Sequence, residues 1–354
     1  MSGKRSISSR HCAIIGAGPA GTAAAITCAG AGMTVSLFER AAFPRDRPGE
    51  TLHPGAEPIL RRLGVFDDVA TLAHVRHEGQ WTIDDGGQPR FVAFGSDRMG
   101  SWRGFQVLRS DLDRTLLARA SALGVAIHQP CKVSGPSFDG GRLVGVATDS
   151  GIHACDYLIN ATGHPRWVGE ARRSSPPLHA FYGYCTDEPE LESLPRFSCE
   201  PQGWTWIARI RRDLIQWTRL AWPDTNVRDS LRWSRERPAE LARCDAVARV
   251  RAADVTWRIA DPAPLDRVFL VGDAAFRLDP ASSHGVLKAL MTGMMAAQAI
   301  GSIEGGTMTP VAARTGYARW IQDWFERDVS QLRRFYAERV TGGLPAAGVP
   351  PSAA

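Results

Sequence analysis

The sequence predicts an α/β fold in which a Rossmann-like domain carries an inserted antiparallel β-sheet domain and ends in a C-terminal helix. A strand, an alanine-rich helix and a second strand follow one another between residues 11 and 38, as in a βαβ unit. A buried strand and an apolar helix at 268–300 resume this pattern after a middle region of short, tryptophan-bearing strands. No long linker divides the chain, so we expect the middle domain to be inserted rather than appended.

Hydrophobic patterning and turn residues assign each element along the chain. We expect Ser110 and Asp111 to cap the helix that follows them. The Asp139-Gly140-Gly141 run supplies the positive φ values that a tight hairpin needs. The pattern predicts strands at 11–16, 34–38 and 268–272, helices at 21–30, 56–65, 109–123, 285–300 and 315–340, antiparallel strands at 74–107 and 181–258, a small meander at 125–163, and a disordered tail at 343–354.

The composition limits the function classes. The net charge of +5 comes mostly from arginine, and an arginine excess between residues 207 and 258 suits either a solvated face or a face for a phosphate-bearing cofactor or acidic partner. The sequence contains no helix-turn-helix, zinc-finger or RNA-binding signature, so we expect no nucleic-acid partner. It contains no apolar run of membrane-spanning length and no apolar leader, so we expect a cytoplasmic protein without stable membrane insertion.

The seven cysteines are scattered and include no C-x-x-C pair. An odd number without tight spacing argues against a disulfide framework and against a zinc site. We therefore expect free, buried thiols and no metal centre.

The first motif is Gly16-x-Gly18-x-x-Gly21, which follows a predicted strand and opens a helix. Gly16 permits a tight turn, Gly18 lets the backbone approach a pyrophosphate, and Gly21 lets the helix pack closely on the sheet. Glu39 ends the next strand, where its carboxylate can accept hydrogen bonds from ribose hydroxyls. In this full βαβ context, the motif predicts a dinucleotide site at the N-terminus of the helix.

The second motif runs from the strand at 268–271 through Gly272-Asp273 to Asp279-Pro280 and Gly285. A carboxylate at the end of a buried strand can hold a ribityl hydroxyl. A helix that begins near Gly285 can direct its N-terminal amides at negative charge on a reduced flavin. An unrelated strand–loop–helix would have the same outline, but the presence of both motifs in one chain favours a flavin site.

With these two motifs, the chain resembles the flavoprotein monooxygenases related to p-hydroxybenzoate hydroxylase and their flavin-dependent halogenase relatives, from about residue 11 to residue 300. The resemblance rests on GAGPAG, Glu39-Arg40, FPRDRPGETL, VLRSDLDRTLL, the ATG turn at 161–163 and GDA…DP…G. It implies a glutathione-reductase-type FAD-binding domain and an antiparallel sheet domain on the substrate side. We expect the FAD-binding domain at 1–75, 100–175 and 258–305, the sheet domain at 76–99 and 176–257, and a helical region at 306–342.

The resemblance also implies which residues bind FAD. Arg47 would lie near the flavin, Arg109 would contact FAD, and Asp273 would bind the ribityl chain. Pro280, His284 and Gly285 would line the isoalloxazine. The expected cofactor-binding residues are Gly16, Gly18, Ala20, Gly21, Glu39, Arg40, Arg47, Arg109, Gly163, Gly272, Asp273, Pro280, His284, Gly285 and Val286.

Three side chains are candidates for acid–base chemistry. His53 and Glu50 lie in the loop that the resemblance places beside the flavin, and His284 precedes the second helix. For each of them a bracing or capping role is the structural alternative. Trp204 and Trp206 are the candidates for substrate binding, with core packing under one sheet face as their alternative.

Two departures from the halogenase relatives bear on function. Those relatives carry a catalytic lysine and a WxWxIP motif. This sequence has no lysine between Lys4 and Lys132, and its Trp-Thr-Trp-Ile run continues without a proline. Lys288 is expected to reach solvent rather than substrate. GETLHP, GWTWIA and DPASSHG are most similar to flavoproteins that oxidise tryptophan in quinone-cofactor biogenesis. Asn160 replaces an aspartate that many relatives have before the ATG turn, which suggests a weakened local interaction.

These observations predict an FAD-dependent monooxygenase that hydroxylates an electron-rich aromatic substrate through a flavin C4a-hydroperoxide. The substrate would be an aromatic small molecule or a tryptophan side chain in a peptide or protein. O₂ is the expected oxidant. The sequence has no second GxGxxG, so NAD(P)H would bind transiently or a separate flavin reductase would supply electrons. A halogenase, an isoprenoid-type flavin reductase and a non-catalytic flavin-binding assembly factor are the alternatives.

Overall fold

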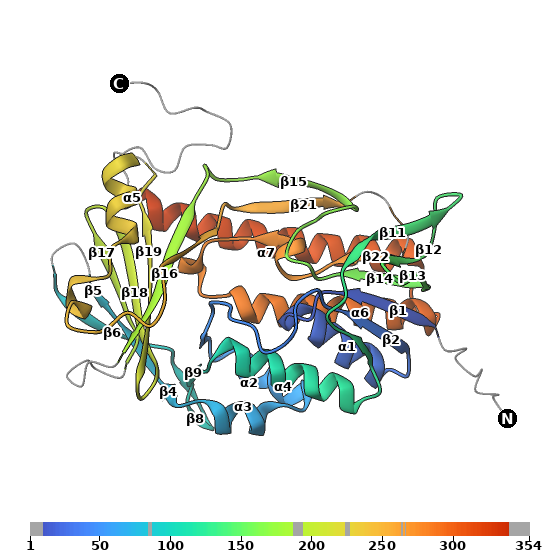
Figure 1. Cartoon of the computed structure of the whole chain (residues 1–354), viewed down its shortest axis with the longest axis horizontal. Helices are drawn as coiled ribbons and strands as arrows, with labels where there is room; N and C mark the ends of the chain where they lie inside the picture. Colours follow the sequence, from blue (N-terminus) through green and yellow to red (C-terminus); the bar gives the residue numbers. More distant parts are fainter. Residues whose placement is uncertain are drawn as a thin grey trace.

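A computed structural model of the chain describes residues 10–83, 87–186, 194–223, 227–262, 265 and 267–339. It contains two main sheets, one parallel and one antiparallel except for the parallel pair β5–β17, with helices packed on and between them (Figure 1). This confirms the predicted fold class. The expected tail at 343–354 lies outside the described residues.

The parallel sheet brings together strands from both ends of the chain. β14 pairs with β1 on one side and with β22 on the other, with Leu158 aligned to both Ala13 and Val268. The late strand therefore completes the sheet that the first βαβ unit begins. The strand order is β10 (Ala126–His128), β2 (Thr34–Phe38), β1 (His11–Ile15), β14 (Tyr157–Asn160) and β22 (Val268–Leu270).

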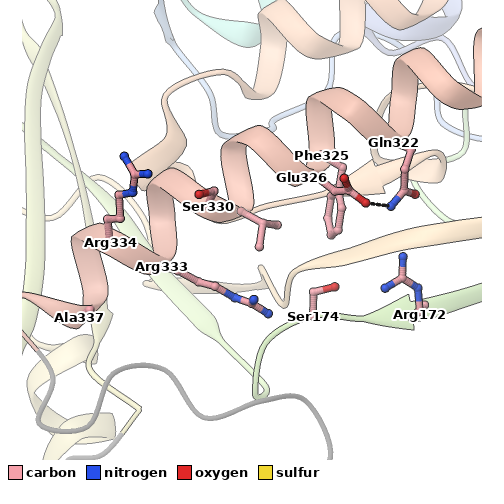
Figure 2. A pocket seen from close by; sticks show the side chains of 10 residues that line it. Arg172, Ser174, Gln322, Phe325, Glu326, Ser330, Arg333, Arg334 and Ala337 are labelled. Carbon is pink, nitrogen blue, oxygen red and sulfur yellow. Dashed lines mark hydrogen bonds between the residues drawn. The ribbon is translucent and has the colours of Figure 1, made fainter.

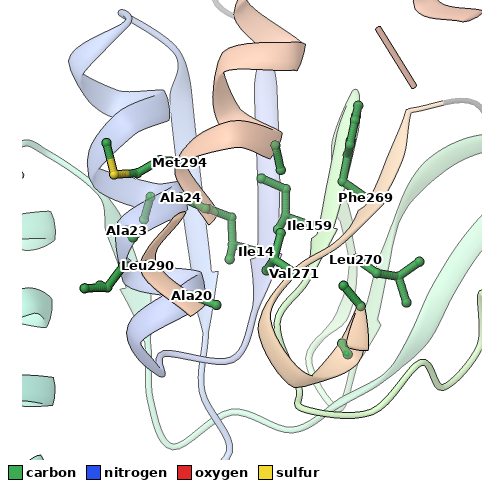
Figure 3. Close-up of a cluster of buried hydrophobic side chains, with 14 of the residues drawn as sticks. Ile14, Ala20, Ala23, Ala24, Ile159, Phe269, Leu270, Val271, Leu290 and Met294 are labelled. Carbon is green, nitrogen blue, oxygen red and sulfur yellow. The ribbon is translucent and has the colours of Figure 1, made fainter. Parts of the chain in front are cut away.

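Helices α1 (Pro19–Gly30) and α6 (Gly285–Glu304) cover this sheet side by side (Figure 3). Small residues allow the close approach, since a Cβ atom on Gly293 would lie 2.1 Å from the carbonyl oxygen of Ala20. By length and hydropathy α6 is the one helix in the described part of the chain that could cross a membrane. In the structure its apolar residues Leu290 and Met294 are instead buried within the domain core (Figure 3).

The antiparallel sheet has seven strands and lies at the opposite end of the molecule (Figure 1). Two strands from early in the chain join five from the middle, so the chain leaves the region of the parallel sheet twice to build it. The domain boundaries themselves stay a prediction. In order, the strands are β20 (Arg251–Asp254), β16 (His179–Thr186), β19 (Leu214–Ala221), β18 (Gly203–Arg211), β17 (Arg196–Glu200), β5 (Gly79–Ile83) and β6 (Pro89–Ala93).

The C-terminal helix α7 (Pro310–Ala337) connects the two ends of the molecule (Figure 1). It starts earlier than predicted because Thr309 caps it, accepting a hydrogen bond from the Ala312 amide at 3.2 Å. Near its start, the hydroxyl of Tyr317 donates to the carbonyl of Leu270 in β22 at 2.6 Å. Further along, aromatic residues of α7 pack against the antiparallel sheet, with Phe335 beside Phe197.

Helix α4 (Arg109–Ala122) corrects one expectation. Its N-cap residue is Leu108, and no side chain caps it. Ser110 and Asp111 lie inside the first turn, where Asp111 pairs with Arg114 at 2.9 Å, so the predicted cap was wrong.

The remaining elements surround the two sheets. The further helices are α2 (Ala56–Leu63), α3 (Phe66–Leu72) and α5 (Val227–Arg235), with short 3₁₀ turns at Ala239–Leu241, Gly272–Ala274 and Pro280–Ser282. Three small antiparallel sheets are β3 (Thr51–Leu52), β9 (Gly104–Gln106) and β4 (Val75–His77); β11 (Val133–Asp139), β12 (Arg142–Thr148) and β13 (Gly151–Ala154); and β15 (Gly169–Arg173), β21 (Arg258–Pro262) and β23 (Phe276–Arg277). β7 (Ser96–Asp97) and β8 (Gly100–Ser101) form a two-stranded hairpin. No disulfide bond joins the cysteines in the described part of the chain, and no three His, Cys, Asp or Glu residues there are grouped as a metal site.

Candidate active site

The glycine turn between β1 and α1 has the geometry that its sequence predicts. Gly16 has a φ of 105°, and a Cβ atom there would lie 2.5 Å from the carbonyl oxygen of Ala161. A Cβ atom on Gly21 would lie 1.8 Å from the carbonyl oxygen of Gly16. No side chain caps α1 and its first turn carries no acidic residue, so its N-terminal amides are available to an anion.

Glu39 is buried at the end of β2, with 3% of its surface exposed. Its carboxylate accepts hydrogen bonds from the amides of Ala17 and Ala41, both at 2.9 Å. It also accepts one from the Nη1 atom of Arg45 at 3.0 Å. Glu39 therefore fixes the glycine turn and holds an arginine beside it.

Arg45, rather than Arg47, is the loop arginine at the glycine turn. Its Nη2 atom donates to Asp113 at 3.4 Å and lies 3.4 Å from the position of a Cβ atom on Gly18. Its Nε atom is buried without a partner in the structure. Arg47 is exposed and forms no hydrogen bond or ion pair with the described residues. Sequence reasoning missed Arg45, although its closer spacing to Glu39 was a signal.

Arg109 and Asp113 form an ion pair within α4. Arg109 donates from Nε and Nη2 to the Asp113 carboxylate at 3.2 and 3.1 Å and from Nη1 to the carbonyl of Pro48 at 2.8 Å. Asp113 is fully buried and accepts from both Arg109 and Arg45. Arg40, the other predicted arginine, is exposed next to Glu39.

The second motif centres on Asp273. Its Oδ1 atom accepts from Lys288 Nζ at 2.9 Å, and its Oδ2 atom accepts from Arg277 Nε at 3.1 Å. Burial acts to raise the pKa of this carboxyl, but Lys288 and Arg277 outweigh it and lower the pKa to about 2. Lys288 is only 3% exposed, so the expectation that it reaches solvent was wrong. Its buried ammonium group is compensated by Asp273 and by the carbonyl of Phe276.

The two motifs lie against each other. A Cβ atom on Gly272, whose φ is 59°, would lie 2.9 Å from the Cβ of Ala20 in the first motif. A Cβ atom on Gly163, in the ATG turn, would lie 3.9 Å from the Cβ of Asp273. The loop at 44–52 reaches the same region, since a Cβ atom on Gly49 would lie 3.5 Å from the side chain of Val286. One continuous face therefore runs from Glu39 to the N-terminus of α6.

Asn160 holds the ATG turn in place. Its side-chain oxygen accepts from the amide and the hydroxyl of Thr162 at 3.1 and 2.8 Å, and its amide group donates to the carbonyls of His164 and Arg166 at 3.1 and 3.3 Å. The prediction that Asn160 weakens the local interaction before the ATG turn was therefore wrong, because the asparagine uses both its donor and its acceptor here.

Glu50 links the loop to the antiparallel sheet. It is buried and accepts a hydrogen bond from the hydroxyl of Tyr184 in β16 at 2.5 Å and one from the Gly49 amide at 2.8 Å. Burial raises the pKa of Glu50, although these hydrogen bonds and the charge of Arg109 oppose the rise. Tyr184 was not predicted, because only the folded sheet brings it to the loop.

His53 and His284 form a pair at the N-terminus of α6. Their ring centroids lie 5.6 Å apart, and Phe94 contacts the His53 ring on another side. His53 Nδ1 accepts a hydrogen bond from the Gly55 amide at 3.0 Å. Burial and the neighbouring His284 lower the pKa of His53. His284 Nδ1 lies 3.3 Å from Oδ2 of Asp328, a buried carboxylate on α7 that the sequence did not reveal.

The two candidate tryptophans differ in their surroundings. Trp204 is 1% exposed and packs 5.5 Å from Phe197 in the core cluster that also contains Tyr336, so its predicted place at the substrate was wrong. Trp206 is half-buried on the same sheet face. The register places Trp206 opposite Phe197 and Thr218. Trp206 therefore remains a candidate for substrate contact.

Comparison with known proteins bears on this face. Residues 10–175 match the family model described as FAD binding domain. This segment, which contains the glycine turn, is thus similar to FAD-binding domains.

Three curated relatives extend the match beyond this domain. A tryptophan 2-halogenase of Chondromyces crocatus is 27% identical over 93% of this chain and 68% of the relative. A 1H-pyrrole-2-carbonyl-[peptidyl-carrier protein] brominase of Pseudoalteromonas luteoviolacea is 29% identical over 81% of this chain and 76% of the relative. A menaquinone reductase of Mycobacterium tuberculosis is 26% identical over 86% of this chain and 80% of the relative.

Solved structures share the whole fold. The myxobacterial chondrochloren halogenase CndH aligns with a TM-score of 0.84 at 24% identity, over 92% of this chain and 83% of that chain. The peptidyl tryptophan dihydroxylase QhpG aligns with a TM-score of 0.72 at 22% identity, over 94% of this chain and 77% of that chain. At these identities, the likeness shows the fold.

The residues present fit FAD. The uncapped amides of α1 and the open side of Gly18 suit a pyrophosphate, and the guanidinium of Arg45, whose side chain is 15% exposed, lies beside Gly18. Glu39 lies at the end of β2, where the Rossmann arrangement places the adenosine ribose. Asp273 is 43% exposed and so keeps carboxylate surface for the ribityl chain. The flavin end would then lie near His284 and the N-terminus of α6.

Proposed function

We propose that this protein is an FAD-dependent monooxygenase that hydroxylates an electron-rich aromatic substrate, with a tryptophan side chain as the first candidate. The observation that carries the proposal is an aromatic face on the antiparallel sheet, joined to the flavin-side loop by the Tyr184–Glu50 hydrogen bond. Tyr182, Trp206 and Phe197 belong to this face. Thr218 aligns with Tyr182 on one side and with Trp206 on the other, and Trp206 aligns in turn with Phe197. Flat aromatic ligands suit such a wall.

FAD, when bound and reduced by NAD(P)H or by a flavin reductase, would supply two electrons and activate O₂, so that one oxygen atom enters the aromatic ring and the other leaves as water. The protein's own groups have separate tasks. Because His53 Nδ1 accepts the Gly55 amide, the neutral ring carries its proton on Nε2 and acts as a donor. Because His284 Nδ1 donates to Asp328, its Nε2 is free to accept the proton that the ring loses. Glu50 positions the loop that carries His53.

Halogenation is the second candidate, and the relatives named tryptophan 2-halogenase and brominase favour it. The lysine chemistry that the sequence resemblance associates with halogenases counts against it. Lys288 is buried on Asp273, Lys132 lies in the loop before β11, and Lys4 lies outside the described residues. The menaquinone reductase relative keeps the isoprenoid-type reductase, a flavin-dependent enzyme, as a further alternative. Electrons would come from NAD(P)H or from a separate flavin reductase.

The test is mass spectrometry of products formed by the FAD-loaded protein with a flavin reductase, NADH and ¹⁸O₂. Free tryptophan and a tryptophan-containing peptide are offered in separate reactions, each with and without bromide. One ¹⁸O atom in the product, independent of bromide, is the expected result. A brominated product without ¹⁸O would replace the proposal with the halogenase alternative, and no product from either substrate would contradict the choice of tryptophan.

A further inference from the structure

A cavity of about 540 Å³ lies between helix α7 and strand β15, apart from the FAD face (Figure 2). Its volume falls in the range of roughly 300–1,000 Å³ that is usual for small-molecule sites. None of its lining residues belongs to the predicted flavin or substrate positions. The lining residues are Arg172, Ser174, Gln322, Phe325, Glu326, Val329, Ser330, Arg333, Arg334 and Ala337.

Two arginines face each other across this cavity. Figure 2 shows Arg172 pointing from β15 toward α7 and Arg333 pointing from α7 toward β15, while Arg334 points away from the strand. In the part of the chain that the structure describes, neither Arg172 nor Arg333 has an acidic side chain within ion-pair distance. The one lining carboxylate, Glu326, accepts a hydrogen bond from Gln322 at 2.5 Å. The cavity is therefore positively charged and lacks a partner for its two facing cations.

The remaining walls divide into a polar and an apolar part. Phe325 and Val329 form the apolar side and are nearly buried, at 3% and 7% exposure. Ser174 lies between the two arginines (Figure 2), and Ser330 is the other serine of the lining. Guanidinium and hydroxyl donors bind the oxygens of carboxylates, sulfonates and phosphates, and the apolar side suits a flat hydrocarbon body.

We propose that this cavity is a second binding site, for an organic anion whose oxyanion group sits between Arg172 and Arg333 and whose apolar body contacts Phe325 and Val329. The site is separate from the proposed monooxygenase site and does not depend on it. It lies on the helix that also carries Asp328 and Tyr336, which contact His284 and Asp279 on the flavin side. The ligand would thus occupy the outer side of a helix that supports the flavin end.

The probe is 1-anilinonaphthalene-8-sulfonate, an aromatic oxyanion, titrated calorimetrically into the FAD-saturated full-length protein. N-phenyl-1-naphthylamine, which lacks the sulfonate, is the neutral comparison. We expect one sulfonate probe per chain, bound at least about tenfold more tightly than the neutral compound. The same dissociation constant is expected in FAD-free protein, because the site does not overlap the flavin face.

Arg172→Gln and Arg333→Gln should each weaken binding of the sulfonate probe about tenfold and leave the neutral compound unaffected. Ser174→Trp, which fills the space between the two arginines without a charge change, should abolish binding of both. Arg327→Gln is the matched control, since Arg327 is an exposed arginine of α7 outside the cavity. The proposal is overturned if the probe does not bind at millimolar concentration, if the neutral compound binds equally well, or if the Arg172 and Arg333 variants behave like the Arg327 control.

Discussion

Lys288 Nζ lies 2.9 Å from Asp273 Oδ1, and this ion pair ties the Gly-Asp turn to the first turn of α6. Asp273→Asn leaves the buried ammonium group without its anion. We expect the free energy of unfolding to fall by about 1–3 kcal/mol, less than for a fully buried pair because Asp273 is partly exposed. Urea unfolding at pH 7 measures this, with the exposed hairpin variant Asp139→Asn as control.

The same variant has a predictable pH signature. The pKa of Asp273 is about 2 in the folded protein, below its ordinary value of 3.8. Its stabilising contribution is therefore complete above about pH 4 and is lost as the pH falls toward 2. The stability difference between the wild-type protein and Asp273→Asn should shrink over that interval. A difference that stays constant from pH 7 to pH 2.5 would mean that the ion pair contributes nothing.

Arg45 and Arg47 provide a direct test of how the loop meets FAD. Arg45→Ala removes a guanidinium held beside Gly18 by Glu39 and Asp113. We expect the FAD dissociation constant to rise by about 10- to 100-fold, as for the loss of a charge-assisted hydrogen bond. Arg47→Ala should leave it unchanged, because Arg47 is exposed. Flavin fluorescence titration measures both, and a larger effect at Arg47 would reverse the assignment.

Two glycines of α6 separate close packing from helix propensity. A Cβ atom on Gly293 would lie 2.1 Å from the Ala20 carbonyl, whereas a Cβ atom on Gly301 would meet nothing within 4 Å. Gly293→Ala should therefore lower the free energy of unfolding by about 2–4 kcal/mol and reduce bound FAD. Gly301→Ala should raise it by about 0.5–1 kcal/mol through helix propensity. Thermal unfolding distinguishes the two, and equal effects would contradict the α1–α6 contact.

Tyr336 donates to the fully buried carboxylate of Asp279 at 3.0 Å. Burial raises the pKa of Asp279 to about 6, although donors including Tyr336 oppose the rise. A folded pKa above the ordinary 3.8 means that this group's contribution to stability decreases as the pH rises from about 4 to 6. Tyr336→Phe should enlarge that decrease and cost about 1–3 kcal/mol at pH 7.

Tyr317→Phe is the control for this effect. Its hydroxyl donates to the carbonyl of Leu270, which does not titrate, so its cost should be the same at pH 4 and pH 7. Urea unfolding at both pH values provides the comparison. If the two variants had the same pH dependence, Asp279 would be ionised through the whole range and its raised pKa would be wrong.

The sequence predicted the parts of this structure that local pattern controls. The turn at Gly16 follows from the steric needs of a strand–helix junction. Period-two alternation likewise placed Trp204 and Trp206 on one sheet face. These features depend on residues that are close in the chain.

The errors came from contacts that only the folded chain creates. Trp204 is buried and Trp206 half-buried because the aromatic residues of α7 pack at one end of the sheet face. Lys288 is buried because the carboxylate of Asp273, across a turn, accepts a hydrogen bond from its ammonium group and compensates its charge. The choice between Arg45 and Arg47 depends on the path of an irregular loop, for which no periodicity exists.

Asp328 provides the last prediction, because it lies on the C-terminal helix and its carboxylate pairs with His284, one of the two histidines of the proposed reaction. Its carboxylate is buried and accepts from His284 Nδ1, which leaves Nε2 of that ring as the proton acceptor. Asp328→Asn would allow the opposite tautomer, so we expect kcat for hydroxylation to fall by about 10²-fold while FAD affinity is retained. Asp323→Asn, an exposed position on the same helix, should change neither. His53→Gln should lower kcat as well. Because burial lowers the pKa of His53, the acid limb of the wild-type kcat/KM profile should lie below the ordinary histidine value of 6.5. A wild-type rate in Asp328→Asn would show that His284 needs no orienting carboxylate, and a loss of FAD together with activity would assign Asp328 to the fold rather than to the reaction.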